Sequence, residues 1–200
     1  MSSIELKPIR QQTITLVIKG KSPIIQHQWS EKALREMREK HAGKKTKNRD
    51  IRDPAAESEA AMYRTADGEP GIPAMAFKAS LIGAAHKDIG LEKTLLRKAL
   101  FLNVSDGNAV LPFLDHSEPF TREDCVRVGA GSTDLRYRPQ FDQWRVRLTM
   151  EFDAEMLRSE DIINLINRAG YGVGICEWRP EKGGEFGRFS VDTSEPVEVK

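Results

Sequence analysis

Strict alternation of apolar and polar residues is the clearest structural signal in this chain. It occurs in residues 13–19, where Ile14, Leu16 and Ile18 are the apolar positions. It is longest in residues 144–152, where five apolar residues are separated by arginine, threonine and glutamate: Trp144, Val146, Leu148, Met150 and Phe152. A period of two places one set of side chains on each face of a strand. Both segments are therefore predicted to be half-buried strands.

In several other segments the apolar residues recur at the spacing of a helix. Residues 31–41 follow Ser30, a favourable N-cap, but carry only a thin apolar stripe. Residues 72–90 hold the best core helix of the first half, and residues 159–170 form an amphipathic helix that starts at Ser159 and ends at Gly170. Shorter helices are predicted from Pro54 and within 91–100. The remaining strands are predicted at 109–114, as two strands around a loop in 125–152, and at 186–191, before an acidic tail.

The predicted order is strand, insertion, helix, strand, strand, helix, strand. This is the order of the ferredoxin-like, or RRM-like, split βαβ sheet of α+β proteins, here with a large basic insertion at about residues 24–70. An apolar fraction of 39% in 200 residues suits one ordinary core. A single domain spanning residues 1–200 is therefore expected.

Composition narrows the class of protein. No run of about 18 apolar residues and no apolar leader segment is present, so the protein is expected to be cytoplasmic. Cys125 and Cys176 lie far apart without a CxxC or Cys/His spacing, which predicts neither a disulfide nor a metal site. No cofactor is indicated. The formal net charge of +1 hides a local excess, because residues 32–52 contain nine Lys/Arg and three Asp/Glu.

Three short motifs resemble the RAMP superfamily, whose members form the crRNA-binding backbone of CRISPR effector complexes. They are ITLVIKGKSPI at 14–24, GIPAMAFKASL at 71–81 and GYGVGICEWRPEKGGEFGRFSV at 170–191. In the second motif, Lys78 matches the family's lysine. The chain resembles, more loosely, compact stand-alone members carried by bacteriophages and prophages. The resemblance implies a RAMP-like domain whose insertion reaches over a bound strand and whose copies assemble into a helical oligomer.

Basic and aromatic residues that a single-stranded nucleic acid could contact fall into four groups. Cations along a strand release counterions from phosphates, and aromatic rings stack on splayed bases. Lys78, at the start of its helix, could bind an anion beside free amides. Solvated surface charge and ordinary packing are the alternative explanations for each group. The candidates are His27, Trp29, Lys44, Lys45, Lys47, Arg49, Arg52, Lys78, Arg136, Tyr137, Arg138, Arg179, Lys182 and Arg188.

Two glycine clusters lie behind the amphipathic helix, where glycine permits positive φ and close approach of a neighbouring chain or a phosphate. The alternative is a helix C-cap followed by a hairpin loop. A dinucleotide-binding loop is disfavoured because the glycines follow a helix rather than a strand. We assign the clusters to the nucleic acid and to assembly with the next subunit: Gly170, Gly172, Gly174, Gly183, Gly184 and Gly187.

Catalytic motifs are weak. The four histidines form no HxxxH or HExxH pattern. Asp50 and Asp53 lie in the insertion but flank basic residues. The sequence therefore predicts a non-enzymatic protein that binds single-stranded DNA or RNA mainly through phosphates and assembles head to tail along it. The alternatives are a ribonuclease that uses Asp50 or His27, and a protein-interaction module that interferes with a CRISPR effector complex.

Overall fold

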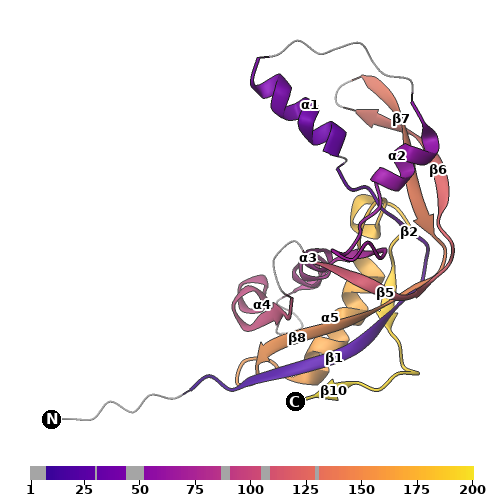
Figure 1. Cartoon of the computed structure of the whole chain (residues 1–200). Coiled ribbons are helices and arrows are strands. Elements are labelled where there is room, and N and C mark those ends of the chain that lie inside the picture. The colour runs from indigo at the N-terminus through magenta and orange to yellow at the C-terminus, as the bar shows by residue number, and fades with distance from the viewer. Residues whose placement is uncertain (1–7, 30, 44–51, 87–90, 105–108, 129–130) are drawn as a thin grey trace.

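Strands β1 (Gln11–Gly20) and β8 (Trp144–Asp153) form the centre of a curved antiparallel sheet (Figure 1). They pair along their whole length, from Gln11 opposite Asp153 to Lys19 opposite Arg145. The sheet has seven strands in the order β10-β1-β8-β5-β3, with β4 also beside β8 and β9 also beside β1. The computed structural model describes residues 8–29, 31–43, 52–86, 91–104, 109–128 and 131–200.

The other elements follow the chain around this centre. Before β8 they are β2 (Ile24–Ile25), α1 (Glu31–His41), α2 (Pro54–Ala60), β3 (Gly71–Pro73), α3 (Ala74–Ala84), α4 (Lys93–Ala99), β4 (Leu100–Leu102), β5 (Val110–His116), β6 (Phe120–Val128) and β7 (Ser132–Phe141). After β8 they are α5 (Ser159–Gly172), the 3₁₀ turn η2 (Pro180–Lys182), β9 (Phe189–Val191) and β10 (Glu198–Val199). The prediction of an α+β protein with antiparallel sheets is confirmed.

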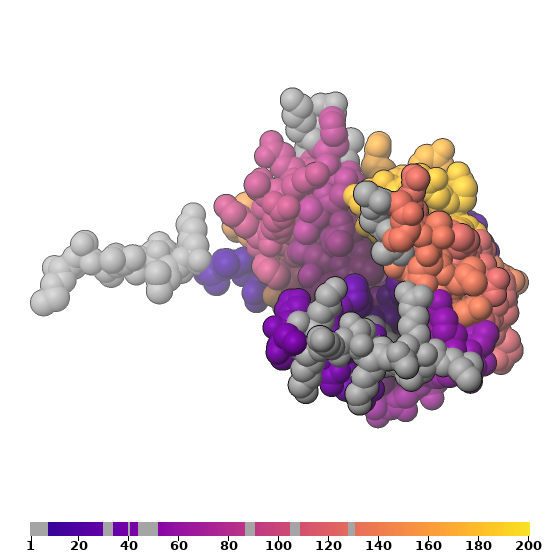
Figure 2. All heavy atoms as spheres, turned by 90° about the horizontal axis from the view of Figure 1, so that it is seen from above, coloured from indigo at the N-terminus to yellow at the C-terminus, as the bar shows by residue number. Residues whose placement is uncertain are grey.

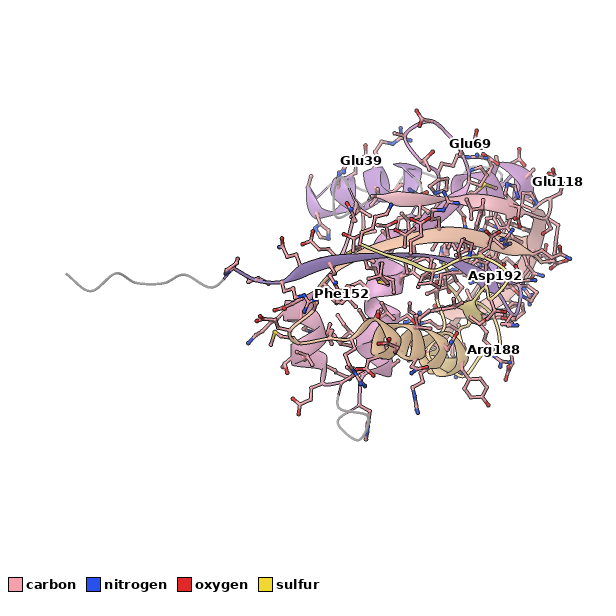
Figure 3. The ribbon with its side chains drawn as sticks, turned by 90° about the horizontal axis from the view of Figure 1, so that it is seen from below. Glu39, Glu69, Glu118, Phe152, Arg188 and Asp192 are labelled. Atoms are coloured by element: carbon pink, nitrogen blue, oxygen red, sulfur yellow. The ribbon has the colours of Figure 1, made fainter. Side chains whose placement is uncertain are left out.

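The alternating pattern produces a two-layer core. The five apolar side chains of β8 are all at most 1% exposed, and they form one cluster with Ile14, Leu16 and Ile18 of β1. Helices α3, α4 and α5 cover this face of the sheet (Figure 3). Burying each large aliphatic side chain contributes roughly 1.5–3 kcal/mol, so this row explains why β1 and β8 occupy the centre.

The opposite face of the sheet is polar. The hydroxyl groups of Thr15 and Thr149 hydrogen-bond across the β1–β8 pair at 3.1 Å. Arg145 forms ion pairs with Asp115, Asp192 and Glu195. The segment after β9 thus contacts this face, and what the sequence suggested was an acidic tail supplies β10, which pairs with Ile14 and Thr15 of β1.

A second sheet of three strands has the order β2-β7-β6. Strands β6 and β7 form a long hairpin that extends away from the main sheet (Figure 1), and α2 packs against it. The sequence predicted only two strands around a loop in 125–152, whereas this region contains β6, β7 and β8. The insertion and the hairpin therefore belong to one structural unit, because β2 pairs with β7.

The boundaries of α5 are close to those expected, whereas the segment predicted as a helix over 72–90 begins with strand β3 and its helix, α3, ends at Ala84. Helix α5 starts at Ser159, but Arg158 occupies the N-cap position and makes no side-chain cap bond. Ser30, the expected cap of α1, lies outside the described residues. Strand β9 begins at Phe189 rather than at 186, because the preceding residues form a glycine-rich loop. No helix in the described ranges is long and apolar enough to cross a membrane.

Candidate nucleic-acid interface

A network of charged side chains joins the β6–β7 hairpin to the glycine-rich loop. Its centre is Arg138 of β7, which is 1% exposed. Its guanidinium donates to Asp124 Oδ2 at 2.6 Å and to Glu177 Oε2 at 3.1 Å. A buried arginine with two carboxylates is a structural tie between elements, and it leaves no surface for a phosphate. The prediction that Arg138 contacts nucleic acid is therefore not supported by its burial.

His27 and Arg136 lie at the edge of the same network. His27 Nδ1 is 3.8 Å from Glu177 Oε1 and 3.4 Å from Arg136 Nη1. The hydrogen bond from His27 lowers the pKa of Glu177, and the charges of Arg138 and Arg136 act in the same direction. The structure thus brings together three sequence-predicted residues, His27, Arg136 and Arg138, around a glutamate that the sequence did not single out.

Trp178 forms the aromatic part of this junction. The guanidinium of Arg122 lies 4.9 Å from its ring centroid, that of Arg138 lies 5.2 Å away, and Phe186 is a further ring neighbour at 6.1 Å. Trp178 has a φ of 49° and Cys176 a φ of 61°, both in the left-handed region that side chains rarely adopt. The stacked arginines hold the loop in this conformation.

Arg52 and Tyr137 form a second tie, between α2 and β7. Arg52 pairs with Glu57 Oε2 at 2.5 Å and with Asp134 Oδ1 at 3.1 Å. Its guanidinium also lies 5.3 Å from the Tyr137 ring centroid. A hydrogen bond with Glu123 is the main cause of the raised pKa of Tyr137. Arg52 and Tyr137 therefore contribute to the packing of the hairpin against the insertion.

Lys78 caps a helix instead of lying beside free amides. Its Nζ donates to the carbonyl of Leu96 in α4 at 3.0 Å and lies 5.1 Å from the Phe101 ring centroid. Partial burial lowers the pKa of Lys78. The lysine therefore adds a second donor to a carbonyl in the last turn of α4, where a cation is favourable.

The cations of the glycine-rich segment differ in their partners. Arg179 donates to Glu181 Oε2 at 2.8 Å and to the carbonyl of Cys176. Arg188 has a looser ion pair with Glu185 at 3.7 Å and stacks on Tyr171 at 5.2 Å. Lys182 is exposed and forms no ion pair with any described residue.

The glycines mostly serve the loop's own packing. A Cβ on Gly170 would lie 1.9 Å from the carbonyl oxygen of Phe189, and one on Gly184 would lie 1.8 Å from that of Trp178. Gly174, Gly183 and Gly187 have positive φ values of 70°, 77° and 64°. Around Gly172, in contrast, nothing lies within 4 Å of an added Cβ. The close approach predicted for a neighbouring subunit is thus made, at Gly170 and Gly184, within this chain.

The basic arm, which we define as residues 29–49, has few contacts with the rest of the candidate interface in its described part. Trp29 is 61% exposed, and no described side chain of α1 is buried. Arg35 and Arg38 form no ion pair with the carboxylates that the structure describes. Seen from above, the atoms of α1 lie at the surface (Figure 2). Lys44, Lys45, Lys47 and Arg49 lie outside the described residues.

The two cysteines have different environments. Cys176 lies in the glycine-rich loop, where burial raises the pKa of its thiol to about 12. Burial likewise raises the pKa of the nearby Tyr63 hydroxyl to about 12. Cys125 is exposed on β6, the edge strand of the small sheet. In the described ranges, no group of three or more His, Cys, Asp or Glu side chains could hold a metal ion.

The sequence analysis did not identify the acidic residues of this network, Asp124 and Glu177. Asp124 and Glu177 pair with arginines, and Arg122 stacks on Trp178. A signal was available, because β7 carries charges at alternate positions and β6 carries Arg122, Glu123 and Asp124 in a row. The observed register places Arg122 opposite Arg138 and Asp124 opposite Arg136.

Comparison with solved structures gives a similarity in fold. No protein-family model and no curated protein matches the chain. The chain is similar to the crystal structure of Cmr6 from Pyrococcus furiosus, with 11% sequence identity and a TM-score of 0.43, over 92% of this chain and 100% of that chain. At this TM-score the similarity assigns no function to the residues of this chain.

Proposed function

We propose that this protein binds single-stranded nucleic acid, and that the basic arm makes the main phosphate contacts. The observation that carries the proposal is the contrast between two sets of cations. Arg52, Arg136, Arg138 and Arg179 are occupied by carboxylates of the chain, whereas Arg35 and Arg38 on α1 have no such partner among the described carboxylates. Unpaired cations are the ones that can release counterions from phosphates.

The sequence on both sides of α1 favours the same function. Trp29 precedes the helix with a largely exposed ring, which can stack on a base. Lys44, Lys45, Lys47 and Arg49 follow it. A short aromatic and basic segment of this kind contacts backbone and bases without reading sequence, so little sequence preference is expected.

The strand order supports a ferredoxin-like, RAMP-like domain. Strands β9, β1, β8 and β5 are neighbours in this order, and all three pairings are antiparallel. Helix α3 lies between β1 and β5 in sequence, and α5 lies between β8 and β9. This is the connection pattern of the split βαβ sheet. We further propose that copies line up head to tail along the strand.

A charge-removal series tests the role of the arm. Replacing Arg35, Arg38, Lys44, Lys45, Lys47 and Arg49 with Ala should lower affinity for every single strand and reduce the salt slope by roughly 0.7 per lost phosphate contact. The matched control removes Lys93, Arg97 and Lys98 of α4, exposed cations far from the arm in sequence. Fluorescence anisotropy at several salt concentrations measures both quantities. An unchanged slope in the arm variant would refute the proposal.

We propose binding without hydrolysis. Asp53, a candidate for acid/base chemistry, accepts hydrogen bonds from the amides of Ala55 and Ala56 and caps α2. Single strands incubated with the protein and Mg²⁺ or Mn²⁺ should remain full length on a gel. Reproducible cleavage that is lost in Asp53→Asn, which keeps the cap, would replace the binder with a nuclease.

A further inference from the structure

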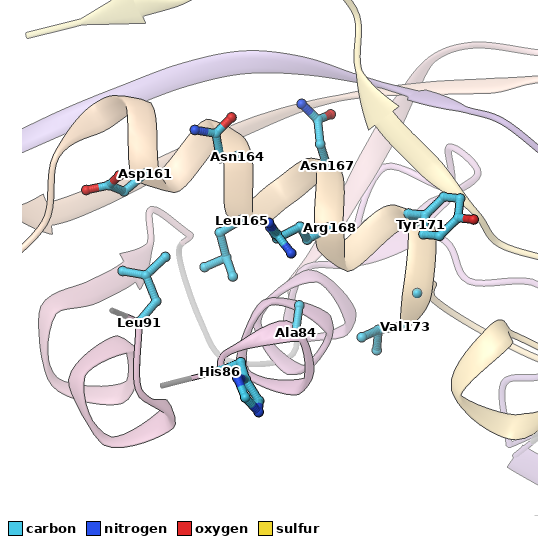
Figure 4. A pocket seen from close by; sticks show the side chains of 11 residues that line it. Ala84, His86, Leu91, Asp161, Asn164, Leu165, Asn167, Arg168, Tyr171 and Val173 are labelled. Carbon is cyan, nitrogen blue, oxygen red and sulfur yellow. The ribbon is translucent and has the colours of Figure 1, made fainter. Parts of the chain in front are cut away.

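A groove runs between α5 and the segment that follows α3, on a part of the molecule that the function proposed above does not use. Its volume is about 860 Å³. Figure 4 shows Leu165 and Arg168 of α5 on one side, Ala84 and Leu91 on the other, and Tyr171 at one end. Leu165 and Leu91 are buried, whereas Arg168 and Tyr171 are exposed. The groove therefore has an apolar floor and a rim with one cation and one aromatic ring.

Among the described residues, Tyr171 is the most exposed large apolar or aromatic side chain, at 74%. The guanidinium of Arg188 stacks on its ring at 5.2 Å, which leaves the other side of the ring open to solvent. Arg168 lies three residues before Tyr171 on α5, so the two share one face of the helix.

The charges around this face are mainly positive. Arg168 has no ion-pair partner among the described residues. Arg188 has only Glu185 at 3.7 Å, and that glutamate side chain is 86% exposed. Asp161, at the far end of the groove, is engaged by Arg158 at 2.9 Å, and this contact lowers its pKa. An open ring flanked by two weakly engaged arginines can hold a flat, electron-rich group that carries an anion.

We propose that Tyr171, Arg168 and Arg188 form a site for one nucleotide unit of a single strand. The base stacks on the open side of Tyr171, and its phosphate lies between the two arginines. This site extends the proposed function and rests on it. It is nevertheless spatially separate, because Glu39 of the arm helix and Arg188 lie on opposite sides of the main sheet (Figure 3). A strand bound at both places must pass around an edge of the sheet.

The test uses the full chain and two probes. In the first, UMP and AMP are titrated separately into ¹⁵N-labelled protein, and shifts are expected for the amides around Tyr171. In the second, a uridine-rich single strand carrying 4-thiouridine is cross-linked and the attachment site is mapped. Tyr171→Ala should lower strand affinity by about fivefold or more, since stacking on one base is worth that much, and should abolish cross-linking to α5. Tyr171→Phe keeps the ring and should retain both.

Arg97→Ala is the control, because it removes an exposed arginine of α4 that does not line the groove. It should bind as the wild type does. Tyr171→Ala with unchanged affinity and no shifts near Tyr171 on titration would overturn this site while leaving binding through the arm intact. Failure of the wild type to bind any strand would instead overturn the proposed function, and the mononucleotide titration would then decide the site alone.

Discussion

Arg138 shows how a residue that resembles a ligand contact in sequence can be structural. Its neighbours Arg136 and Tyr137 gave it the appearance of a basic and aromatic binding motif. In the fold, the alternation of β7 turns Arg138 inward, where Asp124 and Glu177 neutralise it. Because the two carboxylates lie on different elements, Arg138 links the hairpin to the glycine-rich loop.

Arg138→Met should therefore destabilise the protein. It removes one of the two arginines that neutralise Asp124, whose side chain is 4% exposed, and leaves Arg122 as the other. Breaking a buried pair costs about 3–5 kcal/mol when the remaining charge has no other partner, so the loss here should be smaller than that but larger than for an exposed pair. Urea unfolding followed by circular dichroism measures the loss. Arg179→Ala, which breaks an exposed pair with Glu181, is the control and should cost no more than about 1 kcal/mol. Equal losses for the two variants would contradict the structural role.

Glu177, one of the two carboxylates bound to Arg138, makes the stability of this link depend on pH. Its pKa is lowered in the fold, first by the hydrogen bond from His27 and then by Arg138 and Arg136. A lowered folded pKa means that the ionised form contributes stability above the ordinary glutamate pKa, about 4.3. This contribution is lost as the pH falls through the folded pKa. Thermal unfolding from pH 7 to pH 3 should therefore show a shallower acid decline for Glu177→Gln than for the wild type. Parallel curves would show that Glu177 is not linked to stability.

At the scale of elements, the glycine-rich loop closes on its own chain. Gly184 approaches the carbonyl of Trp178, and Gly187 has a positive φ next to the carbonyl of Ile175. The sequence predicted that glycine allows close approach here, and this is correct. It could not identify the neighbour, because that depends on how η2 and the stacked Trp178 fold the segment back on itself.

Two glycine variants separate internal packing from contact with a partner. Gly184→Ala should destabilise the protein by roughly 1–3 kcal/mol, because a Cβ has no space beside the Trp178 carbonyl. Gly172→Ala lies at the end of α5 in open space and should be neutral or stabilising by up to about 1 kcal/mol. Differential scanning calorimetry compares them. A stable Gly184→Ala protein that fails only in strand binding or assembly would restore the original assignment of this glycine to an external contact.

The period-two pattern determined how much of the architecture could be predicted. It identified β1 and β8, because one face of each is covered by helices and the other is polar. It failed for the hairpin, where β6 and the first half of β7 are largely exposed and carry no apolar row. Charged side chains on that hairpin are paired across strands and with the loop, and such pairing depends on register, which a single sequence does not specify.

The whole molecule has two separate surfaces on which the proposed function can be examined: the arm and the groove at α5. If copies line up along a strand, light scattering should show particles whose mass increases with strand length at saturating protein. The arm variant described above should stay at the mass of the protein without nucleic acid. A particle mass that stays constant for strands of increasing length would contradict linear assembly and indicate one closed complex.

The unequal exposure of the two cysteines has a practical consequence for labelling the protein. Maleimide reagents attack thiolates, and Cys176 is a half-buried thiol whose pKa is raised to about 12, so it should react much more slowly than Cys125 at neutral pH. Cys125 is exposed on β6 and accepts a single dye without mutagenesis. That dye would sit on the hairpin edge strand, away from both the arm and α5 in sequence. Cys125 is thus a native site for a fluorescent label. Such a label would report movements of the hairpin relative to a labelled strand.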